Sequence, residues 1–155
     1  MSLCFYKFNI NFTREQRNQL LSIAKTIDFK PLFNEGNFFS TDLQQLSNAV
    51  PKWVVDMFDF SFRRVIFLYN NGNIIPHKDK GRSSVITFPL NSTNAEIVWS
   101  EKNQRLKYYT NSYLINVSEM HHVEIDYPTD RYFLQVPLNG TWDENVEYFK
   151  KIKLI

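Results

Sequence analysis

The chain has 155 residues, of which 43% are apolar and 16% aromatic, and its 18 Lys and Arg against 16 Asp and Glu give a net charge of +2. We expect one globular domain over residues 1–155, because a chain of this length can bury roughly 70% of its unfolded surface. The composition excludes a disordered protein, and the one cysteine excludes an internal disulfide framework. No charge pattern signals nucleic-acid binding, and no window resembles a signal peptide or a membrane span. We therefore expect a soluble, cytoplasmic protein.

Three helix starts are predicted by a Thr followed three residues later by Gln or Glu, which is the capping-box pattern. The first predicts an amphipathic helix over residues 14–27, and the second predicts helical structure over residues 42–58. The third predicts a helix over residues 142–152, in the C-terminal segment 141–155. Residues 1–60 are thus expected to form a helical support for the rest of the domain.

Between residues 62 and 138 the sequence changes to short runs rich in Val, Ile, Phe, Tyr and Thr, which are typical of β-strands. Closely spaced strands without intervening helices cannot form a parallel sheet, because parallel neighbours need long crossover connections. The pattern predicts a mainly β fold, an antiparallel barrel or jelly roll, with the N-terminal helices packed on the outer face of one sheet. The expected strands lie at about 63–69, 74–79, 83–90, 95–99, 105–109, 112–117, 120–126 and 131–137.

All three histidines lie in this strand region. His77 and Asp79 are two residues apart, so an extended strand directs both side chains to one face. His121 and His122 are adjacent and point to opposite faces of a regular strand, so only one of them can join the first pair. Two imidazoles and one carboxylate on one side of an ion are the ligand set of mononuclear non-haem Fe(II) oxygenases. Taken alone, each pair is more often a surface turn or a polar strand position than a metal site.

Two stretches of the chain together resemble the Fe(II)- and 2-oxoglutarate-dependent dioxygenases. Residues 69–91 contain a His-x-Asp motif and look like the proximal half of the site in the prolyl-hydroxylase and aspartyl/asparaginyl-hydroxylase branches. Residues 116–134 contain a His-x-Val segment followed by an Arg and resemble the distal half. The resemblance covers residues 63–137. It implies a double-stranded β-helix (jelly-roll) core over residues 62–138, with Fe(II) and 2-oxoglutarate as cofactors.

The resemblance implies which residues hold the metal. His77, Asp79 and His121 match the three metal ligands of the family. His121 is preferred to His122 because the family has a Val two residues after its distal ligand, and Val123 is in that position here.

The resemblance also implies a cosubstrate site. Arg131 matches the basic residue that pairs with the far carboxylate of 2-oxoglutarate, with an internal ion pair to Asp126 or Asp130 as the alternative. Tyr69 lies where prolyl-hydroxylase-like sequences have a Tyr, and it is expected either to reach the cosubstrate or to line the barrel. Arg82 follows the His-x-Asp loop, and it is expected to contact substrate or cosubstrate, or to be an exposed turn residue.

Two positions depart from the family pattern. Many members have Ser or Thr two residues after the Arg, where this chain has Phe133, and some have a Tyr late in the third strand, where it has Pro89. Thr87 or Gln135 is a candidate to replace the missing cosubstrate-binding hydroxyls.

The leading prediction is an Fe(II)- and 2-oxoglutarate-dependent dioxygenase that uses dioxygen to hydroxylate a peptide or small-molecule substrate, with a peptidyl side chain preferred. The first alternative is a non-catalytic β-helix domain that binds a sugar, a peptide or a partner protein. The second is a cupin-like metalloenzyme that does not use 2-oxoglutarate and gives Arg131 no role. The sequence does not mark the substrate, because substrate contacts in such folds come from loops.

Overall fold

The structure is a computed structural model, and it describes residues 2–31, 38–40, 50–92 and 94–155. The described helices are α1 (Arg14–Ala24), α3 (Lys52–Asp56) and α4 (Trp142–Lys151), with a 3-10 turn η1 (Ser100–Lys102). The described strands are β1 (Phe5–Lys7), β2 (Lys30–Pro31), β3 (Phe38–Ser40), β4 (Ile66–Asn70), β5 (Ile74–His77), β6 (Ser84–Pro89), β7 (Ala95–Trp99), β8 (Gln104–Lys107), β9 (Tyr113–Asn116), β10 (His121–Ile125) and β11 (Arg131–Pro137).

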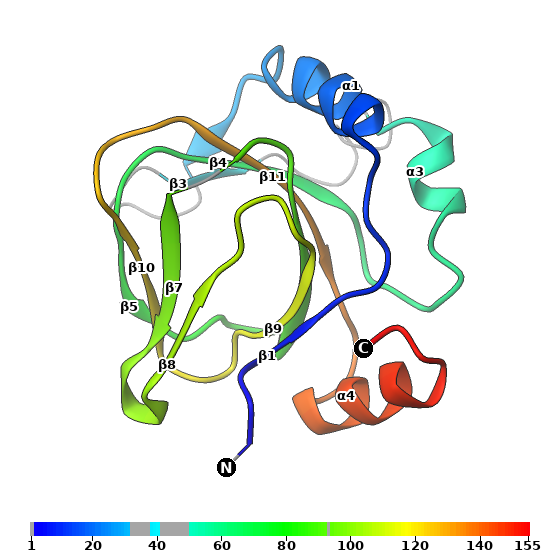
Figure 1. Cartoon of the computed structure of the whole chain (residues 1–155), viewed down its shortest axis with the longest axis vertical. Helices are drawn as coiled ribbons and strands as arrows, with labels where there is room; N and C mark the ends of the chain where they lie inside the picture. Colours follow the sequence, from blue (N-terminus) through cyan, green and yellow to red (C-terminus); the bar gives the residue numbers. More distant parts are fainter. Residues whose placement is uncertain (1, 32–37, 41–49, 93) are drawn as a thin grey trace.

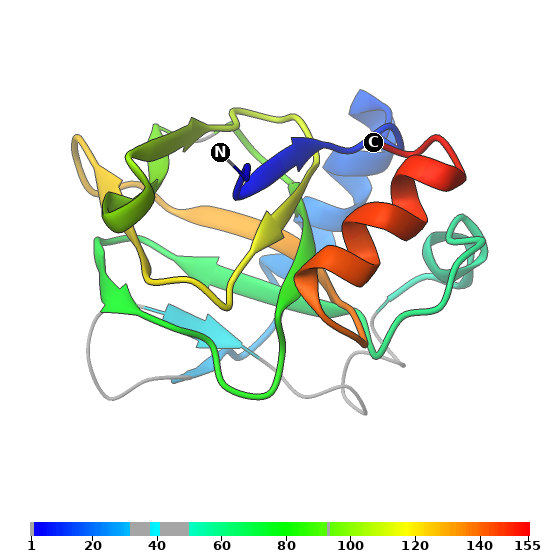
Figure 2. The ribbon, with the colours of Figure 1, turned by 90° about the horizontal axis from the view of Figure 1, so that it is seen from below.

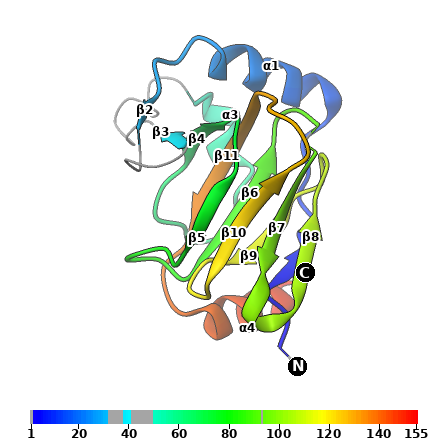
Figure 3. The ribbon, with the colours of Figure 1, turned by 90° about the vertical axis from the view of Figure 1, so that its left-hand side faces the viewer.

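The strands form two antiparallel sheets that lie face to face, as Figures 1 and 3 show. The larger sheet has the order β1-β9-β6-β11-β4-β3-β2, and the smaller has the order β5-β10-β7-β8. The eight strands predicted between residues 62 and 138 correspond to β4 through β11. The fold is therefore mainly β, as predicted, and it is consistent with a jelly roll.

Alternate residues of the strands face the space between the two sheets. On β11, Arg131, Phe133 and Gln135 line a cavity there, and on β4 Leu68 and Asn70 do the same. This alternation is the ordinary period of a strand, whose successive side chains point to opposite faces. The strand register thus decides which side chains can meet inside the fold.

A cluster of aromatic rings packs on the other face of the larger sheet. The ring centroid of Phe88 on β6 lies 6.3, 4.9 and 5.6 Å from those of Phe8, Phe12 and Phe58. Phe149 of α4 joins the cluster, with its centroid 5.2 Å from that of Phe8. Phe12 lies just before α1 and Phe58 shortly after α3, so the cluster links the segments around these helices to β6. Figure 1 shows α1, α3 and α4 on one side of the sheets, and Figure 2 shows α1 and α4 from below.

Two of the three predicted helix starts are confirmed. Thr13 and Thr141 each form a capping box, with Gln16 and Glu144 respectively, at the starts of α1 and α4. The helical structure expected over residues 42–58 is described only as α3, since residues 41–49 lie outside the described residues. None of the helices in the described parts of the chain is long and apolar enough to cross a membrane.

Three short strands occur in the N-terminal segment, where only helices were expected. β1 pairs with β9 and β3 pairs with β4, so these strands extend the larger sheet at both of its ends. β2 pairs with β3 beyond that. Strands of two or three residues carry too little periodicity to be recognised in a sequence.

The aromatic cluster generates a stability prediction. We expect Phe88→Ala to lower the free energy of unfolding by about 3 to 5 kcal/mol, because it removes a ring in contact with three others and leaves a cavity. Urea denaturation of the two proteins measures the difference. Leu3→Ala is the control, since Leu3 is 43% exposed, and its effect should stay within about 0.5 kcal/mol. Equal effects of the two changes would show that the cluster adds no stability.

Candidate metal centre

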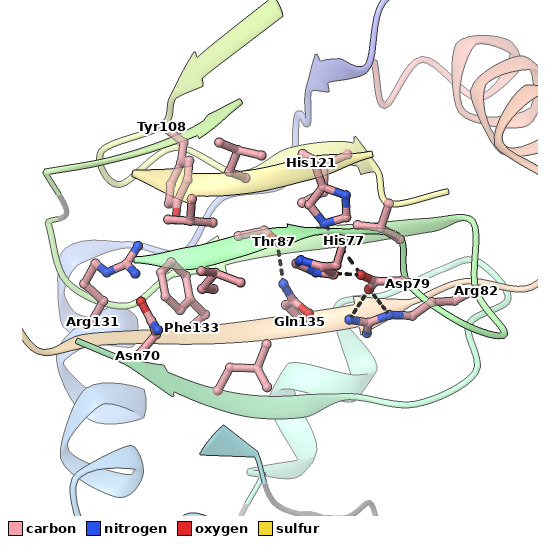
Figure 4. Close-up of a pocket in the computed structure, with 16 residues that line it drawn as sticks. Asn70, His77, Asp79, Arg82, Thr87, Tyr108, His121, Arg131, Phe133 and Gln135 are labelled. Atoms are coloured by element: carbon pink, nitrogen blue, oxygen red, sulfur yellow. Dashed lines mark hydrogen bonds and ion pairs between the residues drawn. The ribbon is translucent and has the colours of Figure 1, made fainter. Parts of the chain in front are cut away.

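His77, Asp79 and His121 converge at one end of the space between the sheets (Figure 4). His77 ends β5, His121 begins β10, and the two residues are directly paired across these antiparallel strands. One nitrogen or oxygen atom from each of the three side chains lies within 4.8 Å of the other two. The pairing of β5 with β10 therefore assembles a group that can hold a metal ion.

The carboxylate of Asp79 stands between the two imidazoles. Its Oδ1 atom is 3.2 Å from Nε2 of His77 and 3.5 Å from Nε2 of His121. The backbone N–H of Asp79 donates to the carbonyl of Val117 at 2.9 Å, which ties the loop after β5 to the segment before β10. A metal ion held by these three donors would keep further coordination positions open, because three protein ligands do not fill its coordination.

Backbone carbonyls orient both histidine rings. Nδ1 of His77 lies 2.8 Å from the carbonyl of Ile75, and Nδ1 of His121 lies 2.8 Å from the carbonyl of Glu119. A carbonyl oxygen can only accept, so Nδ1 carries the hydrogen in both rings. Each ring therefore turns Nε2 toward Asp79, as imidazole ligands do when their other nitrogen is hydrogen-bonded.

The electrostatics favour the metal-binding protonation states of Asp79 and His121, whereas the raised pKa of His77 favours its protonated form, which competes with metal binding. The hydrogen bond to Asp79 raises the pKa of His77, whereas burial lowers the pKa of His121 and keeps that ring neutral. Burial opposes the ionised form of Asp79, but the hydrogen bond from His77 and the charge of Arg82 outweigh it and hold its pKa below the usual range. Asp79 is thus an anion and His121 a neutral base, which are the forms that bind metals.

Arg82 forms an ion pair with Asp79. Its Nε and Nη2 atoms each lie 2.6 Å from Oδ2 of Asp79, and the two side chains are 13% and 7% exposed. The two carboxylate oxygens are therefore divided, with Oδ2 turned to Arg82 and Oδ1 turned to the histidines (Figure 4). The sequence suggested that Arg82 contacts substrate or cosubstrate, or is an exposed turn residue. The structure indicates another role, in which Arg82 orients the carboxylate of Asp79.

His122 lies on the opposite face of β10. Its Nε2 atom is 2.9 Å from Oε1 of Glu124, which also pairs with Arg105 on the outside of the smaller sheet. The structure therefore brings His121, and not His122, to Asp79.

A cavity extends from these three residues to Arg131, which lies at its other end (Figure 4). The guanidinium is almost fully buried, at 1% exposure. Its Nη2 donates to the carbonyl of Gly72 at 3.1 Å, and its Nε has no hydrogen-bond partner among the described residues. No carboxylate in the described parts of the chain forms an ion pair with it, so the alternative pairing with Asp126 or Asp130 is wrong. A buried cation in this position calls for an anion in the cavity.

Tyr108 is a cavity residue that the sequence did not reveal. It is buried beside Arg131, and hydrogen bonding links the two side chains. Burial raises the pKa of Tyr108 to about 12, so its hydroxyl keeps its hydrogen at neutral pH. Its ring lies 5.8 Å from that of Phe133, which in turn lies 5.7 Å from the guanidinium carbon of Arg131. Phe133, which replaces a hydroxyl of the family pattern, thus supplies a ring face to Arg131, while Tyr108 supplies a hydroxyl.

Thr87 and Gln135 line the cavity between Arg131 and the histidines (Figure 4). Nε2 of Gln135 donates to the hydroxyl of Thr87 at 3.2 Å across the paired strands β11 and β6. Oε1 of Gln135 is buried and has no hydrogen-bond partner among the described residues. The middle of the cavity therefore offers polar atoms to a ligand, and the cosubstrate role of Thr87 or Gln135 stays a prediction.

Tyr69 does not lie in this cavity. It sits between Leu68 and Asn70, which face the cavity, so its own side chain faces the other side of β4. Its hydroxyl donates to Oδ1 of Asp130 at 2.6 Å, and its ring lies 5.2 Å from that of Tyr132. The structure therefore corrects the expectation that Tyr69 reaches the cosubstrate or lines the barrel interior.

No protein-family model matches the chain. No curated protein sequence matches it either. Solved structures do resemble it. The viral collagen prolyl hydroxylase of Paramecium Bursaria Chlorella virus-1, in a 2-oxoglutarate complex, superposes with a TM-score of 0.59 at 9% identity, covering 88% of this chain and 96% of that one.

HygX from Streptomyces hygroscopicus, with nickel, 2-oxoglutarate and hygromycin B bound, gives a TM-score of 0.58 at 11% identity, covering 90% of this chain and 84% of that one. A Trichoplax adhaerens prolyl hydroxylase, in complex with a peptide fragment of hypoxia inducible factor, gives a TM-score of 0.55 at 11% identity, covering 87% of this chain and 82% of that one. The chain thus has the fold of the 2-oxoglutarate- and Fe(II)-dependent oxygenases.

The placement of the two adjacent histidines generates a prediction on metal binding. We expect His121→Ala to abolish tight Fe(II) binding, because it removes one of three converging ligands, whereas His122→Ala should bind Fe(II) as the unchanged protein does. Anaerobic equilibrium dialysis with Fe(II) measures both. Loss of binding in His122→Ala with retention in His121→Ala would reverse the assignment.

The ion pair between Arg82 and Asp79 generates a second prediction on metal binding. We expect Arg82→Gln to weaken Fe(II) binding by about 10- to 100-fold, since residues that orient a ligand have effects of that size. Arg82→Lys keeps the positive charge but loses the paired guanidinium donors that contact Asp79, so this variant should bind Fe(II) with intermediate affinity. The same dialysis measures these variants. Tighter binding in Arg82→Gln would show that the repulsion between guanidinium and metal exceeds the benefit of orientation.

Proposed function

We propose that this protein is an Fe(II)- and 2-oxoglutarate-dependent dioxygenase that hydroxylates a peptide or small-molecule substrate, with a peptidyl side chain preferred. The observation that carries the proposal is the buried Arg131, which lacks a carboxylate partner among the described residues and shares one cavity with His77, Asp79 and His121. A metal group alone is compatible with many activities. A metal group and a buried cation at opposite ends of one cavity fit a dianionic, metal-chelating cosubstrate.

The metal group fits Fe(II). Two imidazole nitrogens and one carboxylate oxygen on one side of an ion form the facial set of non-haem Fe(II) oxygenases. When bound, Fe(II) with 2-oxoglutarate supplies dioxygen activation and the oxidative decarboxylation that yields succinate. His77, Asp79 and His121 would hold the ion, and Arg82 would keep Oδ1 of Asp79 turned toward it.

Arg131 would bind the far carboxylate of 2-oxoglutarate. Its unpartnered Nε and the neighbouring hydroxyl of Tyr108 offer two donors to one anion. Thr87 and Gln135 would contact the middle of the cosubstrate. Apolar side chains complete the cavity lining and would exclude water from the reacting atoms. These side chains are Ile97, Ile115, Val117, Val123 and Phe133.

The two alternative functions draw less support. A cupin-like metalloenzyme without 2-oxoglutarate leaves Arg131 without a role, although a buried and uncompensated guanidinium costs several kcal/mol. In a non-catalytic binding domain the converging donor atoms would be empty or would hold a structural ion, which leaves the buried Arg131 in the same cavity unexplained. The preference for a peptidyl side chain rests on the sequence resemblance, and two of the similar solved structures are prolyl hydroxylases.

Arg131→Ala tests the proposal. Charge-assisted hydrogen bonds contribute about 1.5 to 3 kcal/mol each, so the change should weaken 2-oxoglutarate binding by one or more powers of ten. Fe(II) affinity should stay nearly unchanged, because Arg131 lies at the other end of the cavity. The measurement is a titration of 2-oxoglutarate into the anaerobic Fe(II) protein, followed by its charge-transfer absorption.

Tyr69→Phe is the control for this titration, because Tyr69 faces away from the cavity and its change should leave 2-oxoglutarate affinity as it is. Equal affinities for Arg131→Ala and the unchanged protein would contradict the cosubstrate role of Arg131 and favour one of the two alternatives. Release of succinate on addition of dioxygen would separate the proposed enzyme from a domain that only binds.

A further inference from the structure

Three arginines gather beside the loop that carries Asp79. Arg63 and Arg64 are exposed and lie just before β4, and Nη1 of Arg63 donates to the carbonyl of Gly81 in that loop. Burial lowers the pKa of Arg64, and the charges of Arg82 and Arg63 lower it further. Because like charges repel, such a grouping is costly unless solvent or an anion compensates it.

This grouping has almost no compensating acid. Among the described residues, Asp79 pairs with Arg82, and no carboxylate forms an ion pair with Arg63 or Arg64. The exposed Lys78 and Lys80 flank Asp79 in the same loop and add two more positive charges. Residues 60–82 contain five Lys and Arg but one acidic residue, although the whole chain is nearly neutral at +2.

The grouping lies next to the candidate metal centre. Arg82 lines the cavity and is in contact with Asp79, and Arg63 contacts the loop between these two residues. Arg131, in contrast, lies at the far end of the cavity (Figure 4). Arg63 therefore lies beside the stretch of chain that joins Asp79 to Arg82, at the metal end of the cavity.

Resting on the proposed function, we infer that the substrate is a peptide with a carboxylate or phosphate group close to the side chain to be oxidised, and that Arg63 and Arg64 bind that group. Guanidinium forks match both oxyanions and bind them in a bidentate manner. Neither arginine forms an ion pair with a carboxylate in the described parts of the chain, and apart from the Nη1 of Arg63 that donates to Gly81 their donors can bind an anion. The peptide then binds with its anionic group outside the cavity and its reacting side chain inside.

The test uses labelled alanine-based peptides that differ only in their charged positions, which carry glutamate, phosphoserine or the neutral residues glutamine and serine. Fluorescence anisotropy with the metal-free protein measures their binding. We expect the glutamate and phosphoserine peptides to bind about tenfold or more tightly than the neutral ones, and less tightly as salt is added. The two charged peptides distinguish a carboxylate from a phosphate. Equal binding of charged and neutral peptides would overturn the inference.

Arg63→Ala/Arg64→Ala should abolish the difference between charged and neutral peptides. Arg64→Ala alone should reduce it, and this single change leaves the contact of Arg63 with the loop in place. Lys7→Ala/Lys151→Ala removes the same net charge from exposed positions on β1 and α4 and should keep the difference. An equal loss in this control would show that only the net charge matters. Binding of a single-stranded DNA oligonucleotide through the same arginines, without peptide binding, would also overturn the inference.

These measurements need neither Fe(II) nor 2-oxoglutarate, so their outcome is separate from that of the proposed function. If the charged peptides bind as expected while the Fe(II) protein does not bind 2-oxoglutarate, the peptide site stands and the dioxygenase assignment fails. If 2-oxoglutarate binds while charged and neutral peptides bind alike, the enzyme stands and the substrate inference fails.

Discussion

The antiparallel pairing of β5 with β10 is the constraint on which the candidate site depends. It sets His77 directly opposite His121, and the register is irregular just after that point, between His121 and Val123. Because side chains alternate with a period of two, a slip of one residue would turn His121 outward and His122 inward. The loop that follows β5 adds the carboxylate, held by the backbone hydrogen bond from Asp79 to Val117 and by the ion pair of Asp79 with Arg82.

The balance of charge differs between the two ends of the cavity. At one end Asp79 is compensated by Arg82, so the metal group carries little net charge before an ion binds. At the other end Arg131 is buried with a hydrogen bond to a carbonyl and a neutral tyrosine beside it, and no described carboxylate compensates it. The fold bears the cost of desolvating this cation. An anion that spans the cavity would lower that cost at one end and complete a metal's coordination at the other.

The features predicted correctly are those that depend on a short stretch of sequence. The strands β4 through β11 were recognisable because alternation and turn residues are properties of short windows, and the choice of His121 over His122 followed from the family's spacing. The prediction for Tyr69 was wrong because it relied on the number of residues between Tyr69 and His77. Side chains alternate between the two faces of a strand, and Leu68 and Asn70 face the cavity, so Tyr69 faces away from it. Tyr108 was not predicted as a site residue, because it follows β8 of the smaller sheet and its contact with Arg131, which begins β11 of the larger sheet, depends on how the two sheets face each other.

Arg131 is buried, whereas Arg63 and Arg64 are exposed, and this difference in exposure suits the two regions to different kinds of binding. Arg131 is desolvated, so its attraction for an anion is strong and poorly screened by salt. Arg63 and Arg64 face solvent, where each contact with an anion is worth less and is screened. A buried cation therefore suits the tight binding of one small dianion, as the proposed cosubstrate is. Exposed cations suit the steering and selection of a larger molecule that has to leave again, because electrostatic complementarity at a surface changes the association rate and the choice of partner more than the affinity.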